Sequence, residues 1–136
     1  HGIPTYHDNN EEQERGRNVA YLIHVDDISI LHCGDLGHKL RDKDMDMLEE
    51  VDVLIVPVGG VYTIGPKEAA EVVSQVEPSI VIPMHYNDSG LNREVFGKLG
   101  GVEDFIKEVG GGEAKREEKL TISKSKLPEE REIIIL

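Results

Sequence analysis

Apolar and polar positions alternate at strand spacing in the first quarter of the chain. Residues 19–25 (VAYLIHV) and 28–33 (ISILHC) are apolar runs separated only by Asp26 and Asp27, a pattern that predicts an antiparallel hairpin. Residues 1–6 have the pattern of the end of a further strand. We therefore expect a sheet to begin at the start of the chain.

The middle of the chain predicts two buried strands joined by a helix. Residues 51–60 and 79–85 are nearly continuous in apolar, β-branched side chains, which is typical of strands covered on both faces. Between them, residues 65–78 begin with Gly-Pro and then place apolar side chains at helical spacing. Residues 101–112 repeat the helical spacing and end in glycines, which favour the end of a helix.

The remaining segments complete the expected domain. Polar residues 8–18 predict an exposed loop, and the charged stretch 38–51 predicts a short helix. Residues 119–125 and 131–136 are expected to form two closing strands. This order of strands and helices predicts one α/β domain over residues 1–136.

Composition narrows the possible partners. The chain has 27 acidic and 15 basic residues and a formal net charge of −12, which argues against nucleic acid because phosphate binding needs clustered Lys and Arg. A small anionic substrate stays open, since a bound metal ion can reverse the local potential. The apolar runs VLIVPV and IIIL are far shorter than the roughly 20 residues of a membrane helix. Cys33 is the single cysteine, so we expect no intrachain disulfide and a cytoplasmic setting.

Three expected strand ends each deliver a potential metal ligand. His7 follows IPTY, Asp35 follows ILHCG, and His85 follows IVIPM. Imidazole and carboxylate groups are ligands for zinc, and they also suit manganese and iron. Taken singly, each residue has an ordinary alternative, a hydrogen-bonded histidine or a turn aspartate. The pattern of residues leaves both interpretations open.

Several segments together resemble a known family. IPTYHD, GRNVAYLIHVDDISILHCGDLGH and PSIVIPMHYN are similar to the second half of metal-dependent hydrolases of the metallo-β-lactamase superfamily. The branch that they resemble includes the ascorbate-phosphate lactonases and many hydrolases of unknown substrate. The resemblance covers most of residues 1–90, and GDLGH together with VIPMHY is its most specific part. It implies half of a four-layer αββα sandwich, with a mixed, largely antiparallel sheet and helices on one face.

The resemblance also implies a site and a reaction. By it, His7 binds the first of two metal ions, Asp35 bridges both ions, and His85 binds the second. Zinc is the metal expected first, with manganese or iron as alternatives. The implied reaction is hydrolysis of an ester, lactone or phosphoester by a hydroxide held on the metal ions. Asp35 and His38 are the candidate catalytic residues, where His38 either contacts substrate or orients the bridging water, or else is a supporting loop histidine.

The chain departs from the family pattern in one respect. The first metal-binding motif of the family, HxHxDH, is absent from the sequence, and the chain starts at His1 without an initiator methionine. We therefore expect the C-terminal portion of a longer hydrolase, poorly active alone, with apolar strand faces such as VLIVPV left uncovered. The alternative is a non-catalytic α/β fragment that forms a homo-oligomer or complements a separate N-terminal piece.

Other residues near the expected site have either a packing role or two open interpretations. Tyr62 and Thr63 either shape a tight turn before the helix at 65–78 or contact substrate. Tyr86 is expected to pack, and Cys33 is expected to be a small core residue.

Overall fold

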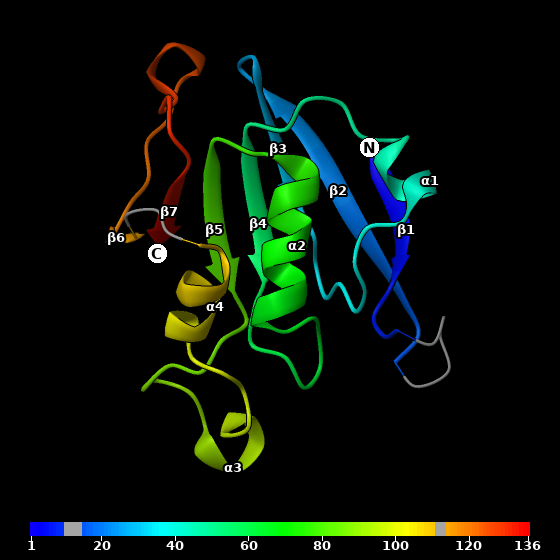
Figure 1. Ribbon diagram of the computed structural model, residues 1–136, viewed down its shortest axis with the longest axis vertical. Helices are drawn as coiled ribbons and strands as arrows, with labels where there is room; N and C mark the ends of the chain where they lie inside the picture. Colours follow the sequence, from blue (N-terminus) through cyan, green and yellow to red (C-terminus); the bar gives the residue numbers. More distant parts are fainter. Residues whose placement is uncertain (10–14, 111–113) are drawn as a thin grey trace.

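The computed structural model describes residues 1–9, 15–110 and 114–136, and within them the chain forms one seven-stranded sheet (Figure 1). The strand order is β1-β2-β3-β4-β5-β7-β6. The strands are β1 (Gly2–Tyr6), β2 (Arg17–Val25), β3 (Ile28–His32), β4 (Val53–Pro57), β5 (Ile80–Met84), β6 (Ala114–Arg116) and β7 (Glu132–Ile135). The helices are α1 (Asp42–Met45), α2 (Pro66–Val76), α3 (Arg93–Phe96) and α4 (Val102–Glu108), with a 3₁₀ turn at Lys124–Lys126.

The sheet changes from antiparallel to parallel at β3. β1 pairs antiparallel with β2, and β2 pairs antiparallel with β3, which confirms the expected hairpin. The other four pairings, from β3 to β4 and on to β6, are all parallel. The sheet is mixed, as expected, but the expectation of a largely antiparallel sheet is wrong. The reason is the strand–helix–strand unit β4-α2-β5, because a crossover helix returns the chain to run parallel.

Helices α2 and α4 cover one face of the sheet and contact each other (Figure 1). α2 starts at Pro66, directly after the N-cap Gly65, so the missing amide hydrogen of proline falls where a helix needs none. It buries Ala69, Val72 and Val73 against the sheet, while α4 contributes the fully buried Phe105. This confirms the helix expected at 65–78 and, over its described residues, the helix expected at 101–112, of which residues 111 and 112 lie outside the described part of the chain.

The opposite face of the sheet is covered by the chain between β6 and β7. Leu120, Ile122 and Leu127 pack against a second apolar cluster made by β3, β4, β5 and β7. The strand expected at 119–125 is therefore wrong, since its alternating apolar residues pack across the sheet and do not pair at its edge. The short strand β6, at Ala114–Arg116, pairs with β7 instead.

A buried aspartate fastens this covering segment. Asp52 is 2% exposed and accepts hydrogen bonds from the backbone N–H of Ser29 at 2.9 Å and from Lys124 Nζ at 2.7 Å. Burial by itself raises the pKa of the Asp52 carboxyl, but the hydrogen bonds from Lys124 and Ser29 outweigh it and hold the pKa below its ordinary value. Asp52 thus links β3, β4 and the 3₁₀ turn as a carboxylate.

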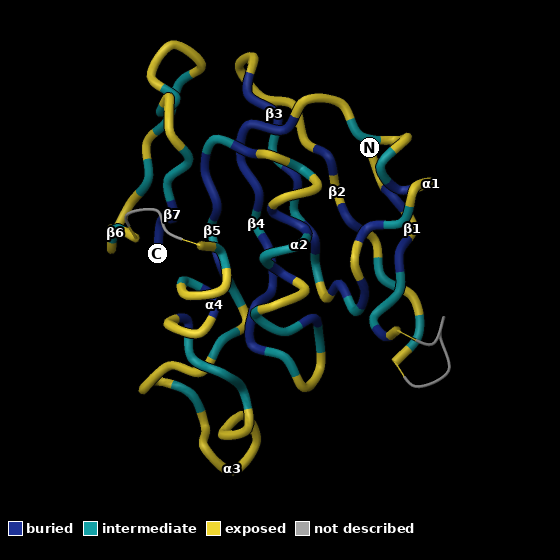
Figure 2. Tube along the Cα trace, in the orientation of Figure 1, coloured by how far each residue is buried: buried dark blue, intermediate teal, exposed yellow. Residues whose placement is uncertain are grey.

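One stripe of exposed apolar side chains lies on β2. Val19, Tyr21, Ile23 and Val25 alternate along one face of this strand, and each is at least 38% exposed. β4, by contrast, is buried along its length (Figure 2). The expectation that VLIVPV would be uncovered is therefore wrong, because α2 covers one face of β4 and the segment between β6 and β7 covers the other.

Two helical segments differ from the expectations. The helix expected within 38–51 is a single turn, α1, and the helix α3 was not expected. α3 belongs to residues 87–100, which stand away from the sheet and are largely exposed (Figures 1 and 2). Among the described residues, no helix has the length and apolar character needed to cross a membrane.

Candidate active site

The topology brings four strand ends to one edge of the sheet. β1 runs parallel to β3, since both pair antiparallel with β2, and β4 and β5 continue in the same direction. The loops that leave the carboxyl ends of β1, β3, β4 and β5 therefore emerge together. His7, Asp35, Thr63 and His85 lie on these four loops, one on each. This is the edge at which parallel sheets usually carry their ligand sites.

Two glycines allow these loops to approach one another closely. A Cβ on Gly37 would lie 2.5 Å from Asp8 Cα and closer still to the carbonyl carbon of His7. A Cβ on Gly59 would lie 3.1 Å from the carbonyl carbon of His85 and would overlap its oxygen. Because both obstacles are backbone atoms, no side-chain rotation would relieve them. Each glycine therefore fixes the position of a candidate ligand on the neighbouring loop.

His85 has a strained backbone. Its φ of 54° is in the left-handed region, which is uncommon for a residue with a side chain. Such conformations persist where the surrounding structure holds them, and they cluster at functional sites. Here the hydrogen bond from Val58 N to Met84 O, at 3.0 Å, and the packing of Gly59 hold this turn.

Asp35 is held next to His85. The Asp35 Oδ1 atom lies 3.3 Å from His85 Nδ1, and both side chains are about half exposed. The backbone N–H of Asp35 donates to Asn18 Oδ1 at 3.0 Å, and the Asn18 amide group donates to the Cys33 carbonyl and to Thr5 Oγ1, both at 2.8 Å. Asn18 therefore ties the loop that carries Asp35 to β1 and β3.

The three candidate ligands line one cavity of about 510 Å³. His7, Asp35 and His85 form one part of its wall, and Tyr62 and Thr63 form another. The remaining lining residues are Tyr86, Leu91, Phe96 and Leu99. A cavity of this volume is the usual size of a small-molecule site.

The donor chemistry fits a metal ion, and the donor set is incomplete. His7 Nε2 is buried and has no hydrogen-bond partner among the described residues, which is costly for a polar atom unless a ligand satisfies it. The carboxylate of Asp35 and the imidazole of His85 supply oxygen and nitrogen donors beside it. Within residues 1–9, 15–110 and 114–136, however, no three or more His, Cys, Asp or Glu side chains gather closely enough to hold a metal ion.

His38 lies outside this cavity. Its Nε2 accepts a hydrogen bond from the backbone N–H of Tyr6 at 3.1 Å, and its Nδ1 lies 2.6 Å from the Lys39 carbonyl oxygen. Both ring nitrogens are thus engaged with backbone groups, and the side chain is almost completely buried. The ring lines a separate hollow beside Tyr6 and Arg41. The geometry gives His38 a part in holding the end of β1, directly before His7.

The sequence interpretation missed several residues of the site. Asn18 was placed in a loop, and its polar side chain next to the apolar run of β2 was the available signal. Leu91, Phe96 and Leu99 lie in a stretch without helical or strand periodicity, so nothing in the pattern connected them with the cavity. Cys33 is a buried core residue as expected, and burial raises the pKa of its thiol to about 12.

Comparison with known proteins agrees with this arrangement. A family model described as a β-lactamase superfamily domain matches residues 1–85. A UPF0173 metal-dependent hydrolase of Thermococcus onnurineus is 38% identical over 90 residues, covering 62% of this chain and 39% of that protein. One from Pyrobaculum islandicum is 40% identical over 76 residues, covering 54% of this chain and 32% of that protein. The chain thus spans about two fifths or less of the length of these relatives.

Solved structures give the same assignment. A Thermotoga maritima protein, provisionally described as a Zn-dependent hydrolase of the metallo-β-lactamase superfamily, matches with a TM-score of 0.78 and 36% identity. The match covers 98% of this chain and 62% of that one. The metallo-β-lactamase fold protein YhfI of Bacillus subtilis, at 11% identity and a TM-score of 0.54, shares the fold alone. The matched family model extends over more than half of the residues, and the chain therefore belongs to the β-lactamase superfamily.

Proposed function

We propose that this chain carries part of the active site of a metal-dependent hydrolase that acts on esters, lactones or phosphoesters. One observation carries the proposal. Three strand-end loops deliver His7, Asp35 and His85 to the wall of a single cavity, where no described residue supplies a hydrogen-bond partner for the buried His7 Nε2. The names of relatives in the same superfamily, which include metal-dependent hydrolases, support it.

The roles of the residues follow from their atoms. Divalent metal ions, when bound, activate water for attack and polarise the scissile carbonyl or phosphoryl oxygen. His7 and His85 offer imidazole nitrogens, and Asp35 offers two carboxylate oxygens. The family resemblance gives Asp35 the bridging position, and its Oδ1 atom lies 3.3 Å from His85 Nδ1 on the neighbouring loop. His38 has a positioning role through Tyr6 N–H, which keeps the end of β1 and therefore His7 in place.

The site requires additional ligands from outside the described residues. Catalytic zinc sites use three or more protein ligands for each ion, whereas the described residues line the cavity with three such donors. We propose that a segment of the longer protein, or a partner chain, supplies the rest and that the complete site holds two ions. Zinc is the first choice, and manganese and iron suit the same donors.

Metal analysis tests the proposal without an assay of activity. Mass spectrometry measures the zinc bound by the purified full-length protein and by its variants His7→Ala, Asp35→Ala and His85→Ala. Each variant is expected to lose at least about tenfold in zinc affinity, as ligand removal usually causes. His24→Ala, which changes an exposed histidine on β2, is the matched control. Unchanged zinc in all three variants would contradict the site.

We also propose that another polypeptide segment covers the exposed face of β2, either in a homo-oligomer or from a complementing N-terminal piece in the cytoplasm. Four apolar side chains alternate on this face, and Ile23 is 41% exposed at its centre. Single exposed apolar residues are ordinary, but a continuous stripe marks an interaction surface. Light scattering after gel filtration tests this. Ile23→Lys is expected to convert an assembly to monomer, and a native protein that is already monomeric would refute association between copies.

If the metal measurements fail while association is found, the alternative of a non-catalytic α/β fragment is favoured. That alternative rests on the incomplete donor set among the described residues. The two measurements therefore separate the two functions.

A further inference from the structure

The lining of the cavity falls into two chemically different groups. His7, Asp35 and His85 supply nitrogen and oxygen donors, and the other lining residues are Leu91, Phe96, Leu99, Thr63 and the rings of Tyr62 and Tyr86. The three apolar residues come from the 87–100 segment, whereas the donors come from the strand-end loops. A substrate whose reacting bond lies at the donors therefore has an apolar surface within the same cavity.

The apolar wall is not part of the folding core. Tyr86 packs against the main core, but Leu91, Phe96 and Leu99 belong to neither apolar cluster of the domain. They lie on the 87–100 segment, which stands away from the sheet (Figure 1). Since these side chains do not stabilise the core, their position beside the donors needs another explanation.

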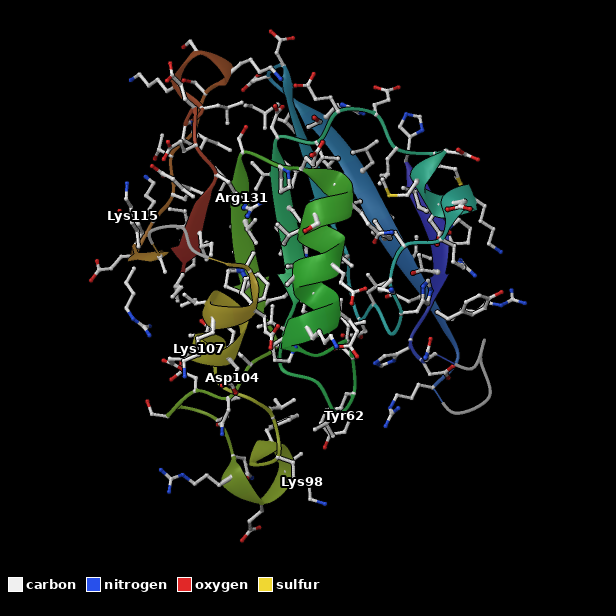
Figure 3. The ribbon with its side chains drawn as sticks, viewed as in Figure 1. Tyr62, Lys98, Asp104, Lys107, Lys115 and Arg131 are labelled. Atoms are coloured by element: carbon white, nitrogen blue, oxygen red, sulfur yellow. The ribbon has the colours of Figure 1, made fainter. Side chains whose placement is uncertain are left out.

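Specific contacts hold the wall in place. Asn87 N donates to Gly100 O at 2.9 Å, and Gly100 N donates to Gly59 O at 2.8 Å, so the two ends of the segment are fastened next to the donors. Tyr62, on the loop between β4 and α2 (Figure 3), donates from its hydroxyl to Val95 O at 3.0 Å and meets the Phe96 ring edge-on. The wall is therefore positioned before any ligand binds, which lowers the entropic cost of binding.

Cationic side chains are absent from the described lining of the cavity. Lys98 and Arg93 lie on the same segment but are exposed and do not line it. The guanidinium of Arg15 lies 5.8 Å from the Tyr62 ring centroid, in a neighbouring hollow that His7 and Thr63 share. The described lining therefore offers a phosphate group no cationic side chain, so the charge that binds it would have to come from the metal ions, whereas an apolar group needs only the lining itself.

We infer that the cavity binds an ester or lactone with an apolar acyl or aryl group, which lies against Leu91, Phe96 and Leu99. This deepens the proposed hydrolase function and rests on it. The volume of about 510 Å³ accommodates such a group beside the reacting carbonyl. The family model ends at residue 85, before this wall, so the donors lie within the matched part and the apolar residues lie beyond it.

Hydrolysis of a substrate series tests the inference in the full-length, zinc-loaded protein. The series consists of p-nitrophenyl acetate, butyrate and hexanoate, with p-nitrophenyl phosphate as the anionic member. Burial of each methylene group is worth up to about a fourfold change in binding. We therefore expect kcat/KM to rise at least about tenfold from p-nitrophenyl acetate to the hexanoate. A flat dependence on chain length, or a preference for the phosphate, would overturn the inference and leave the hydrolase function standing.

Two variants locate the effect. Phe96→Ala is expected to reduce kcat/KM for hexanoate about tenfold and to flatten the chain-length dependence. Lys98→Ala removes an exposed side chain of the same segment that does not line the cavity, and it is expected to keep the dependence. An equal loss in both variants would overturn the assignment of the wall.

A binding measurement separates this inference from the hydrolase proposal. Ligand-observed NMR gives the relative affinities of p-nitrophenyl acetate, butyrate and hexanoate. The signal of the hexanoate ester is expected to broaden most with the native protein, and this broadening is expected to be reduced with Phe96→Ala. If no ester is hydrolysed but binding increases with chain length, the hydrolase proposal fails and the apolar site stands. If binding does not depend on chain length, the apolar site fails.

Discussion

Replacement of Gly37 by alanine tests how closely β1 and the Asp35 loop must approach. A Cβ on Gly37 would lie 2.5 Å from Asp8 Cα, whereas ordinary van der Waals contact begins at 3.4 Å. The backbone at His7 and Asp8 must therefore move by about 1 Å, since no side-chain rotation relieves a contact with backbone atoms. The same movement breaks or lengthens the 2.9 Å hydrogen bond from Gly37 N to Tyr6 O.

The expected cost follows from this geometry. Overpacking of a tightly packed site typically costs about 1–3 kcal/mol, and loss of one backbone hydrogen bond adds about 1 kcal/mol. We expect Gly37→Ala to reduce the free energy of unfolding by about 2–4 kcal/mol. A displacement of about 1 Å at a ligand also weakens metal binding, because site geometry tolerates only about 0.5 Å. Zinc affinity is expected to fall at least about tenfold.

Urea unfolding and zinc titration measure the two effects separately. Gly90→Ala is the matched control, because nothing lies within 4 Å of a Cβ at Gly90, and its free energy of unfolding is expected to change by less than about 0.5 kcal/mol. If Gly37→Ala matches this control in both measurements, the close approach is not required and the reasoning fails. Loss of stability with unchanged zinc affinity would place Gly37 in the fold but not in the site.

Three further predictions concern the core and pH. Phe105→Ala is expected to reduce the free energy of unfolding, measured in urea, by about 3–5 kcal/mol because the ring is fully buried. Phe96→Ala changes a ring that is 38% exposed, and it is expected to reduce the same quantity by less than about 1 kcal/mol. The pKa of Asp52 is lowered in the folded protein, so its contribution to stability is present above the unfolded-state pKa of about 4 and is lost as pH falls below it. The free energy of unfolding of Asp52→Asn is therefore expected to depend less steeply on pH between 4 and 2 than that of the native protein. An identical dependence would contradict this. Cys33, with its thiol pKa raised to about 12, is expected to react with a disulfide reagent at pH 8 only as fast as the protein opens, and labelling that is complete within seconds in native buffer would contradict its burial.

The sequence predicted the strands and helices in which the spacing of apolar residues matches the face that the fold buries. The hairpin of β2 and β3, the buried strands β4 and β5 and the helices α2 and α4 all have local patterns that match their tertiary setting. These expectations needed only chain direction and side-chain periodicity. The interpretation of His7, Asp35 and His85 as one metal site needed the family resemblance as well, since their positions at strand ends left a turn aspartate and hydrogen-bonded histidines equally open.

The remaining features depend on contacts that no local pattern encodes. Leu120 and Ile122 alternate as in a strand, but they pack across the sheet because Lys124 is fastened to Asp52. The 87–100 segment has no period, and its apolar side chains gain a role only because Tyr62 and Gly59 hold them beside the donors. The position of His38 in GDLGH predicted a site residue, but both of its ring nitrogens contact backbone groups.

The fastening of residues 87–100 at a narrow base has a consequence for how substrate preference can change. Asn87 and Gly100 bond to each other across the base, so the rest of the segment leaves and rejoins the domain at one point. A different loop installed there would present a different wall to the loops that carry His7, Asp35 and His85. Under the proposed function, exchange of this stretch between related proteins would transfer substrate selectivity while the strand-end loops stay in place.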